Sequence, residues 1–255
     1  MPTQSLQDWF ATPLGQYVLA RERDWLDRVI PDIFGFHALQ IGLPDIDLTS
    51  ESRIVHRHRA DPSPSATVCA EWHALPFDAH SIDLCVLPHV LESCADPHEM
   101  PHAILREVDR VVRPEGRIII IGFNPWSLFG VKRLWSSSEP PWSGPFVSLV
   151  RMKDWLQLLG FETQAGELTA FIPPCATARW QKRWNFLESV GARWWPVAGG
   201  VYMLEAVKRV QGMRLIAPAW SDQRIRERKL ASVAKRENAT GPSATTRATH
   251  LSVVK

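Results

Sequence analysis

Three side chains that could bind or react with a substrate lie just after apolar runs of the kind that form buried strands. His89 follows Ile82–Leu87, and Asn124 and Trp126 follow Arg117–Gly122. An imidazole titrates near neutral pH, so His89 is either a general base that deprotonates an attacking oxygen or nitrogen, or a structural histidine. Asn124 can donate hydrogen bonds to a substrate. We therefore predict His89 as catalytic, and Asn124 and Trp126 as substrate-binding.

The other potential ligand residues do not indicate a metal site. His56 and His58 alternate without nearby acids or cysteines, so we expect no bound metal. They belong to a basic cluster, Arg53–Arg59, which is either a solvated edge or a site for an anionic ligand. The four cysteines form no CxxC pair and indicate reduced, mostly packed thiols in a cytoplasmic protein: Cys69, Cys85, Cys94 and Cys175.

The elements that must position these residues alternate along the chain. Short apolar runs predict strands: 38–41, 53–58, 66–70, 82–87, 117–122, from 161 onward, and 201–207. Helical spacing covers 9–30, 96–112 and 153–159. Thr12 and Asp96 are the expected N-caps, with Pro13 and Pro97 at the first helical position. This alternation predicts a doubly wound, mostly parallel α/β sheet.

The domain organisation follows from length and composition. The 255 residues are enough for one α/β domain with a tail. We expect a helical segment at 1–35, a main domain at 36–210, and a basic, disordered tail at 224–255. Two irregular insertions, 123–147 and 171–199, are rich in Trp. The longest apolar run has six residues and there is no secretory-signal pattern, so we expect neither a membrane span nor export.

Charge is unevenly distributed. Residues 221–255 carry a net charge of +5, whereas the remaining body carries −3. A mildly acidic body argues against a nucleic-acid groove across the fold.

The chain also has twelve Trp, and three roles are open for the aromatic residues of the first insertion. They form a lid over an apolar acceptor, a patch that touches a membrane, or a small core of their own: Trp126, Phe129, Trp135 and Trp142.

Two longer stretches, Ala74–Glu92 and Leu105–Arg117, contain LPF, a strand with an Asp, and a helix that ends in RxxRPxG. Together they resemble class I S-adenosylmethionine-dependent methyltransferases, in the branch of the ubiquinone and menaquinone biosynthesis methyltransferases. Pro13–Tyr17, Leu87–Glu92 and Gly122–Leu128 resemble a bacterial subfamily of that branch. The resemblance implies a Rossmann-like sheet with an antiparallel last strand.

The same resemblance implies S-adenosylmethionine as cofactor, bound across the carboxyl ends of the strands. The residues at matching positions are Gln40, Gly42, Glu71, Trp72 and Leu87. Glu71 would accept the adenine amino group, or else it is a solvated carboxylate. Trp72 would stack on adenine, or else it is a hydrophobic plug.

The first glycine loop departs from the family's pattern of an acid followed by GxGxG. Only Gly42 remains, while Gln40 replaces the acid, and Pro44 and Ile46 replace the later glycines. These side chains should crowd the cofactor. The crossover that follows is too short for a long helix. No carboxylate is evident at the end of the second strand, since Asp61 falls in an expected loop.

These observations favour a methyltransferase that acts on a small, apolar or aromatic acceptor. The alternative is a non-catalytic relative that binds or regulates a partner, which the altered glycine loop favours. A third hypothesis, contact of the basic tail with nucleic acid or an anionic membrane, rests on charge alone.

Overall fold

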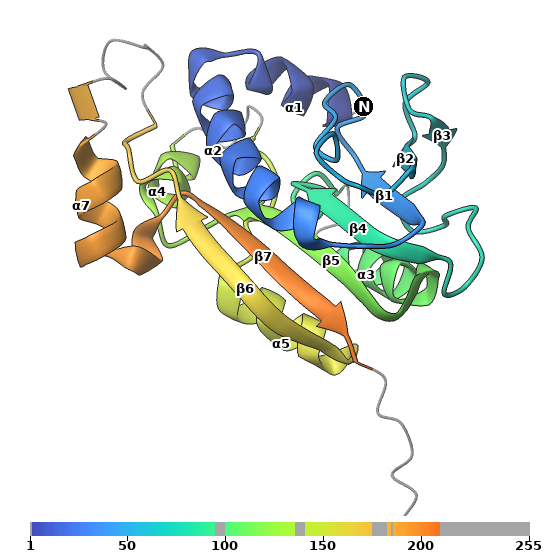
Figure 1. The fold of residues 1–255 in the computed structure, drawn as a ribbon. Helices are drawn as coiled ribbons and strands as arrows, with labels where there is room; N and C mark the ends of the chain where they lie inside the picture. The colour runs from blue at the N-terminus through green and yellow to red at the C-terminus, as the bar shows by residue number, and fades with distance from the viewer. Residues whose placement is uncertain (1, 95–99, 136–140, 175–182, 185, 210–255) are drawn as a thin grey trace, which may run out of the picture. The chain divides into compact units, whose positions relative to one another are not determined.

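One sheet runs through the computed structural model of the protein, which describes residues 2–94, 100–135, 141–174, 183–184 and 186–209 (Figure 1). Its strand order is β3-β2-β1-β4-β5-β7-β6. The strands are β1 His37–Ile41, β2 His56–Asp61, β3 Val68–Cys69, β4 Ile82–Pro88, β5 Val112–Phe123, β6 Phe161–Thr169 and β7 Val201–Lys208. Strands β3 to β5 pair in parallel, and β7 is antiparallel to both of its neighbours. The predicted doubly wound, Rossmann-like sheet with an antiparallel last strand is confirmed.

The helices lie where the capping signals place them, with one correction. They are α1 Pro2–Phe10, α2 Pro13–Val29, α3 Met100–Val111, α4 Leu128–Arg133, α5 Leu149–Leu158 and α7 Phe186–Trp194, with 3-10 turns η1 Ile30–Asp32 and η2 Pro196–Ala198. Thr12 caps α2 by accepting a hydrogen bond from the Gly15 N–H, and Pro13 is its first residue. The predicted helix that Thr12 caps is confirmed as α2, but the helical spacing predicted from residue 9 was wrong for Trp9 and Phe10, which belong to α1 because the chain turns at Ala11 and Thr12. The predicted caps Asp96 and Pro97 lie outside the described residues.

The strands bury both faces because helices cover both. Along β5, Ile119 and Ile121 face the core shared with α1, α2 and α4, while Ile118 and Ile120 face the core shared with α3 and α5. This alternation is the period of two expected for a strand. The two Trp-rich insertions contribute α4 and α7. The N-terminal helices therefore pack onto the same sheet as the main domain, within the unit Met1–Val210.

The RxxRPxG motif stabilises the end of the sheet that lies away from the carboxyl ends of the strands. Arg113 forms an ion pair with Asp83 (2.5 Å), which also accepts the Phe36 and His37 N–H groups. Arg110 donates to the Leu75 carbonyl.

In the described part of the chain, no helix is long and apolar enough to cross a membrane. Cys85 and Cys94 are buried free thiols, whereas Cys69 is exposed.

Candidate functional site

The predicted site residues meet at the edge formed by the carboxyl ends of β1, β2, β4 and β5. Register places Gln40 beside Val86 and Leu87 beside Ile120, so these strands end together. Two of the turns at this edge need a left-handed backbone: Gly42 (φ 80°) and His89 (φ 53°). A left-handed backbone is natural for glycine and uncommon for other residues, so the chain is tightly constrained here.

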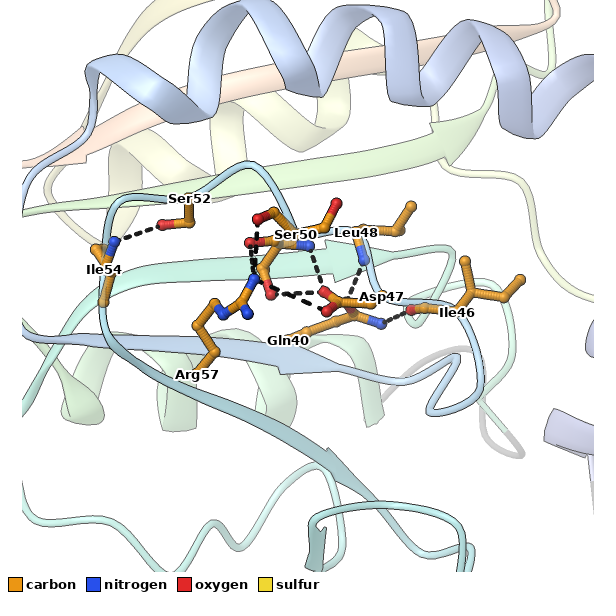
Figure 2. A network of polar contacts seen from close by, with 9 residues as sticks. Gln40, Ile46, Asp47, Leu48, Ser50, Ser52, Ile54 and Arg57 are labelled. Atoms are coloured by element: carbon orange, nitrogen blue, oxygen red, sulfur yellow. Dashed lines mark hydrogen bonds and ion pairs between the residues drawn. The ribbon is translucent and has the colours of Figure 1, made fainter.

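Gln40 organises the loop that replaces the first crossover helix (Figure 2). Its side-chain Nε2 donates to the carbonyls of Gly42, Leu43 and Ile46 at 2.7–3.1 Å. Its Oε1 accepts the Leu48 N–H at 3.0 Å. Gln40 is completely buried. The amide that stands in the place of the family's acid is therefore the structural centre of this loop.

The same loop is held from its other side by the basic cluster. The Arg57 guanidinium donates to the carbonyls of Thr49 and Ser50, both at 3.0 Å (Figure 2). The expected absence of a long helix is confirmed, because residues 42–55 contain none. Three aliphatic side chains take over the packing that such a helix would provide: Leu43, Leu48 and Ile54.

Gly42 is enclosed by the protein. Its N–H donates to the Ala60 carbonyl (2.9 Å), so it is not free for a ligand. A Cβ at this position would lie 2.7 Å from the Val90 side chain. Leu43 packs into the core below the turn. Val90 thus occupies the space beside Gly42, while Pro44 is buried and Ile46 packs against the core.

Asp61 corrects one prediction of the sequence. Strand β2 covers His56–Asp61, not 53–58, so a carboxylate does stand at its carboxyl end. Both carboxylate oxygens are engaged: Oδ1 accepts the Ser63 N–H (2.8 Å) and Oδ2 accepts the Trp72 indole N–H (3.3 Å). Burial raises the pKa of Asp61, and these two hydrogen bonds oppose that shift. Trp72 is itself buried, so it covers the carboxylate, whereas Glu71 beside it is exposed.

His89 lies between two carboxylates that the sequence did not bring together. Its Nε2 is 2.8 Å from Glu22 Oε1, and its Nδ1 is 3.0 Å from Glu92 Oε2. All three side chains are buried. Burial alone lowers the pKa of His89, but the two carboxylates raise it to about 10. Because both nitrogens are engaged and the ring is charged, this arrangement leaves His89 no lone pair with which to act as a general base.

Glu22 was missed because it lies 67 residues before His89. One feature of the sequence could have indicated that Glu22 is buried with a partner. Glu22 falls within the apolar stripe of α2, between Leu19 and Trp25, and an acid in a buried stripe requires a partner. Glu92 additionally accepts the Phe123 backbone N–H. Burial raises the pKa of Glu92, which the contact with His89 opposes.

Asn124 and Trp126 take different positions from those expected of substrate ligands. The Asn124 amide donates to the carbonyls of Val197 (2.8 Å) and Gly199 (3.0 Å), and its Oδ1 accepts the Trp126 N–H. Asn124 is buried and ties two loops together. Trp126 is 79% exposed. Of the aromatic residues in the first insertion, Phe129 and Trp142 belong to the core, while Trp126 and Trp135 do not.

Taken together, these strand ends form a floor that is closed. The strand-end floor consists of Gly42, Leu43, Asp61, Leu87, Pro88, His89 and Val90. Each of these residues is buried, and we call the floor closed in this sense. The two charged or polar clusters on it, Asp61–Trp72 and Glu22–His89–Glu92, are satisfied mainly by protein groups. One oxygen, Glu22 Oε2, is buried without a hydrogen-bond partner among the described residues.

Comparison with known proteins identifies part of this region. Residues 42–120 match the family of the methyltransferase domain. The match begins at the Gly42 turn and ends within β5. The protein YafS of Escherichia coli (strain K12) is 36% identical over 160 residues, which is 60% of this chain and 64% of YafS. The bifunctional biotin biosynthesis protein BioHC of Saccharophagus degradans is 28% identical over 112 residues, 41% of this chain and 19% of BioHC.

The fold agrees with that match. A SAM-dependent methyltransferase from Thermotoga maritima superimposes with a TM-score of 0.57 at 14% identity, over 79% of this chain and 94% of that one. The geranyl diphosphate C-methyltransferase of Streptomyces coelicolor has a TM-score of 0.53 at 11% identity, over 76% and 80%. The fold is therefore that of the class I methyltransferases. The chain spans 64% and 19% of the two curated relatives.

Proposed function

We propose that this chain is an S-adenosylmethionine-dependent methyltransferase that acts on a small, apolar or aromatic acceptor in the cytoplasm. The observation that carries the proposal is the methyltransferase-domain match over residues 42–120, placed on a sheet with the strand order of that fold. Membership of the ubiquinone and menaquinone branch is part of the same proposal. It is supported by the resemblance of the Ala74–Glu92 and Leu105–Arg117 stretches to that branch.

The groups that would hold the cofactor are present, but they fit it only after the floor opens. Glu71 is exposed and can accept an amino group, and Asp61 stands at the end of β2, where hydroxyl groups could be bound. In this structure the Trp72 indole N–H donates a hydrogen bond to the Asp61 carboxylate, and the Val90 side chain lies against Gly42. When bound, S-adenosylmethionine supplies a methyl group on a sulfonium, which is already electrophilic. The protein would then bind the cofactor and align an acceptor.

The aromatic rings around the ends of β4 and β5 support the proposed acceptor class. The Phe123 and Phe10 rings lie 4.3 and 5.6 Å from the His89 ring, centre to centre, and Trp142 packs against Phe123. These rings are buried in the core, so an acceptor would meet aromatic faces only if this edge opened. Because His89 is doubly paired, we assign it a positioning role at this edge. The acceptor would then have to be nucleophilic without His89 as its base.

Calorimetric titration of the full chain with S-adenosylhomocysteine tests the proposal. We expect measurable binding that Glu71→Ala weakens about tenfold, the effect of losing one charge-assisted hydrogen bond. Glu51→Ala is the matched control, because Glu51 is an exposed carboxylate in the crossover loop and should leave the affinity unchanged. No detectable heat, together with no thermal shift, would refute the proposal.

The closed floor favours a second candidate, a non-catalytic relative that binds or regulates a partner. The two candidates differ in one variant. Trp72→Ala uncovers Asp61, and if the floor is a gate, this change should strengthen cofactor binding. If the chain has lost the cofactor site altogether, Trp72→Ala should remain unable to bind S-adenosylhomocysteine although it is folded. Circular dichroism and a thermal melt establish the folding.

A further inference from the structure

Helix α4 and the two residues after it carry an apolar stripe on the outside. Leu128, Val131, Leu134 and Trp135 recur at helical spacing, and all four are exposed, Trp135 to 81%. Such a stripe normally faces the core. The inward side of the same helix is supplied by Phe129, which is completely buried. Leu134 and Trp135 therefore add little to the packing of the domain, while Leu128 and Val131 are about half-buried.

A second segment extends this apolar surface. Trp194, Trp195 and Val197 are 62–72% exposed at the end of α7 and in η2. The Asn124 amide holds the carbonyl of Val197, and its Oδ1 accepts the N–H of Trp126, so the two segments lie together. We name the combined surface the tryptophan face: Trp126, Leu128, Val131, Leu134, Trp135, Trp194, Trp195 and Val197.

The two segments that form the tryptophan face carry only basic charges, whereas the first turn of α7 carries Glu188. Residues 124–135 and 191–200 contain Lys132, Arg133 and Arg193 and no acid. Lys132 and Arg133 lie on the same helix, but their cationic groups lie over the buried Trp142 and Phe146 rings and donate to the carbonyls of Pro174 and Trp142. Arg193 is exposed beside Trp194. The face thus combines exposed tryptophans with the exposed cation Arg193.

We propose that the tryptophan face binds the surface of an anionic lipid bilayer. Tryptophan favours the boundary between headgroups and acyl chains, where its ring is buried and its N–H stays hydrated. Lysine and arginine at the same depth interact with anionic headgroups. This binding is peripheral. A second copy of the chain is a poorer occupant, because a two-fold contact would place the exposed Arg193 of both copies in one apolar interface.

Vesicle flotation of the full chain tests this proposal. Vesicles of phosphatidylcholine alone are compared with vesicles in which about a third of the lipid is phosphatidylglycerol. We expect binding to the anionic vesicles that weakens with salt. Trp126→Ser with Trp135→Ser should lower it at least about tenfold, because partitioning scales with the apolar area buried. Arg193→Gln should lower it about fivefold, as expected for one basic residue at the surface.

Two controls make the result specific to this face. Phe36→Ser with Leu158→Ser removes apolar side chains of similar exposure, 70% and 84%, outside the tryptophan face, and should bind like the wild type. Every variant retains residues 221–255, so binding caused by that basic segment alone would survive the Trp substitutions and overturn the proposal. A lipid-free dimer that the Trp substitutions dissociate would also overturn it, since the face would then serve self-association.

Discussion

Restoring the acid that the methyltransferase pattern has at position 40 is expected to damage this protein. In Gln40→Glu, a carboxylate oxygen replaces the Nε2 that now donates to three carbonyls at 2.7–3.1 Å. Two buried N–H donors are lost, at about 1–3 kcal/mol for each hydrogen bond left unmade. We therefore expect a loss of about 4 kcal/mol in the free energy of unfolding near pH 8. That is a large part of a typical domain's stability of about 5–15 kcal/mol.

The pH dependence of the free energy of unfolding shows whether the loss in Gln40→Glu comes from the new charge or from the lost hydrogen bonds. The three carbonyls and the burial should raise the pKa of the introduced carboxyl group in the folded state above its unfolded value of about 4.3. The variant is then most stable relative to wild type below about pH 4, and its deficit grows as pH rises. Urea unfolding at about pH 5 and about pH 8 measures this difference. Gln40→Met, which removes the same bonds without a charge, should show a deficit that does not change with pH.

Gln157→Glu supplies the matched control for that experiment. Gln157 lies exposed on α5, so the same chemical change should alter the free energy of unfolding by less than about 0.5 kcal/mol. A Gln40→Glu protein as stable as wild type at about pH 8 would refute the assignment of Gln40 as the centre of the loop.

Further predictions concern the buried polar groups. Because the pKa of His89 is about 10 when folded and about 6.5 when unfolded, its stabilising contribution is complete below about pH 6.5 and is lost as pH rises toward 10. Urea unfolding of the wild type should therefore show a loss of about 2–3 kcal/mol between about pH 7 and about pH 9, and Glu22→Gln should flatten this slope; a wild type that is equally stable at both would contradict the ion-pair assignment. Asn124→Ala should cost about 2–3 kcal/mol, measured in the same way, because two loop carbonyls lose their donor.

The fold could be predicted because its signals are local. The four consecutive isoleucines of β5 specify a strand buried on both faces, and Thr12–Pro13 specifies the start of α2. The boundary of β2 could not be predicted in the same way. Its polar sequence, His-Arg-His-Arg-Ala-Asp, has no apolar alternation, and parallel pairing with β1 determines its position.

The candidate site was harder, because its contacts join distant segments. Gly42, Glu71 and His89 could be placed near one edge from the order of the elements. That His89 is a charged group between two acids depends on Glu22 of α2, which no motif includes. Asn124 shows the same difficulty. Its position after β5 was predicted correctly, but its amide serves the Val197 loop, and only the packing of a segment more than seventy residues later determines this.

The loop after β1 has lost the glycines of the methyltransferase pattern, but other residues stabilise it in their place. Gln40 and Arg57 supply the donors, and three buried aliphatic side chains supply the packing, so the loop is complete without the missing glycines. Val90 lies against Gly42 and Trp72 covers Asp61, and neither Val90 nor Trp72 belongs to the loop. Returning the glycines through Pro44→Gly and Ile46→Gly should therefore lower stability without improving S-adenosylhomocysteine binding, whereas Trp72→Ala should improve it. A titration in which the two glycine substitutions alone strengthen binding would show that the loop, and not the floor, excludes the cofactor.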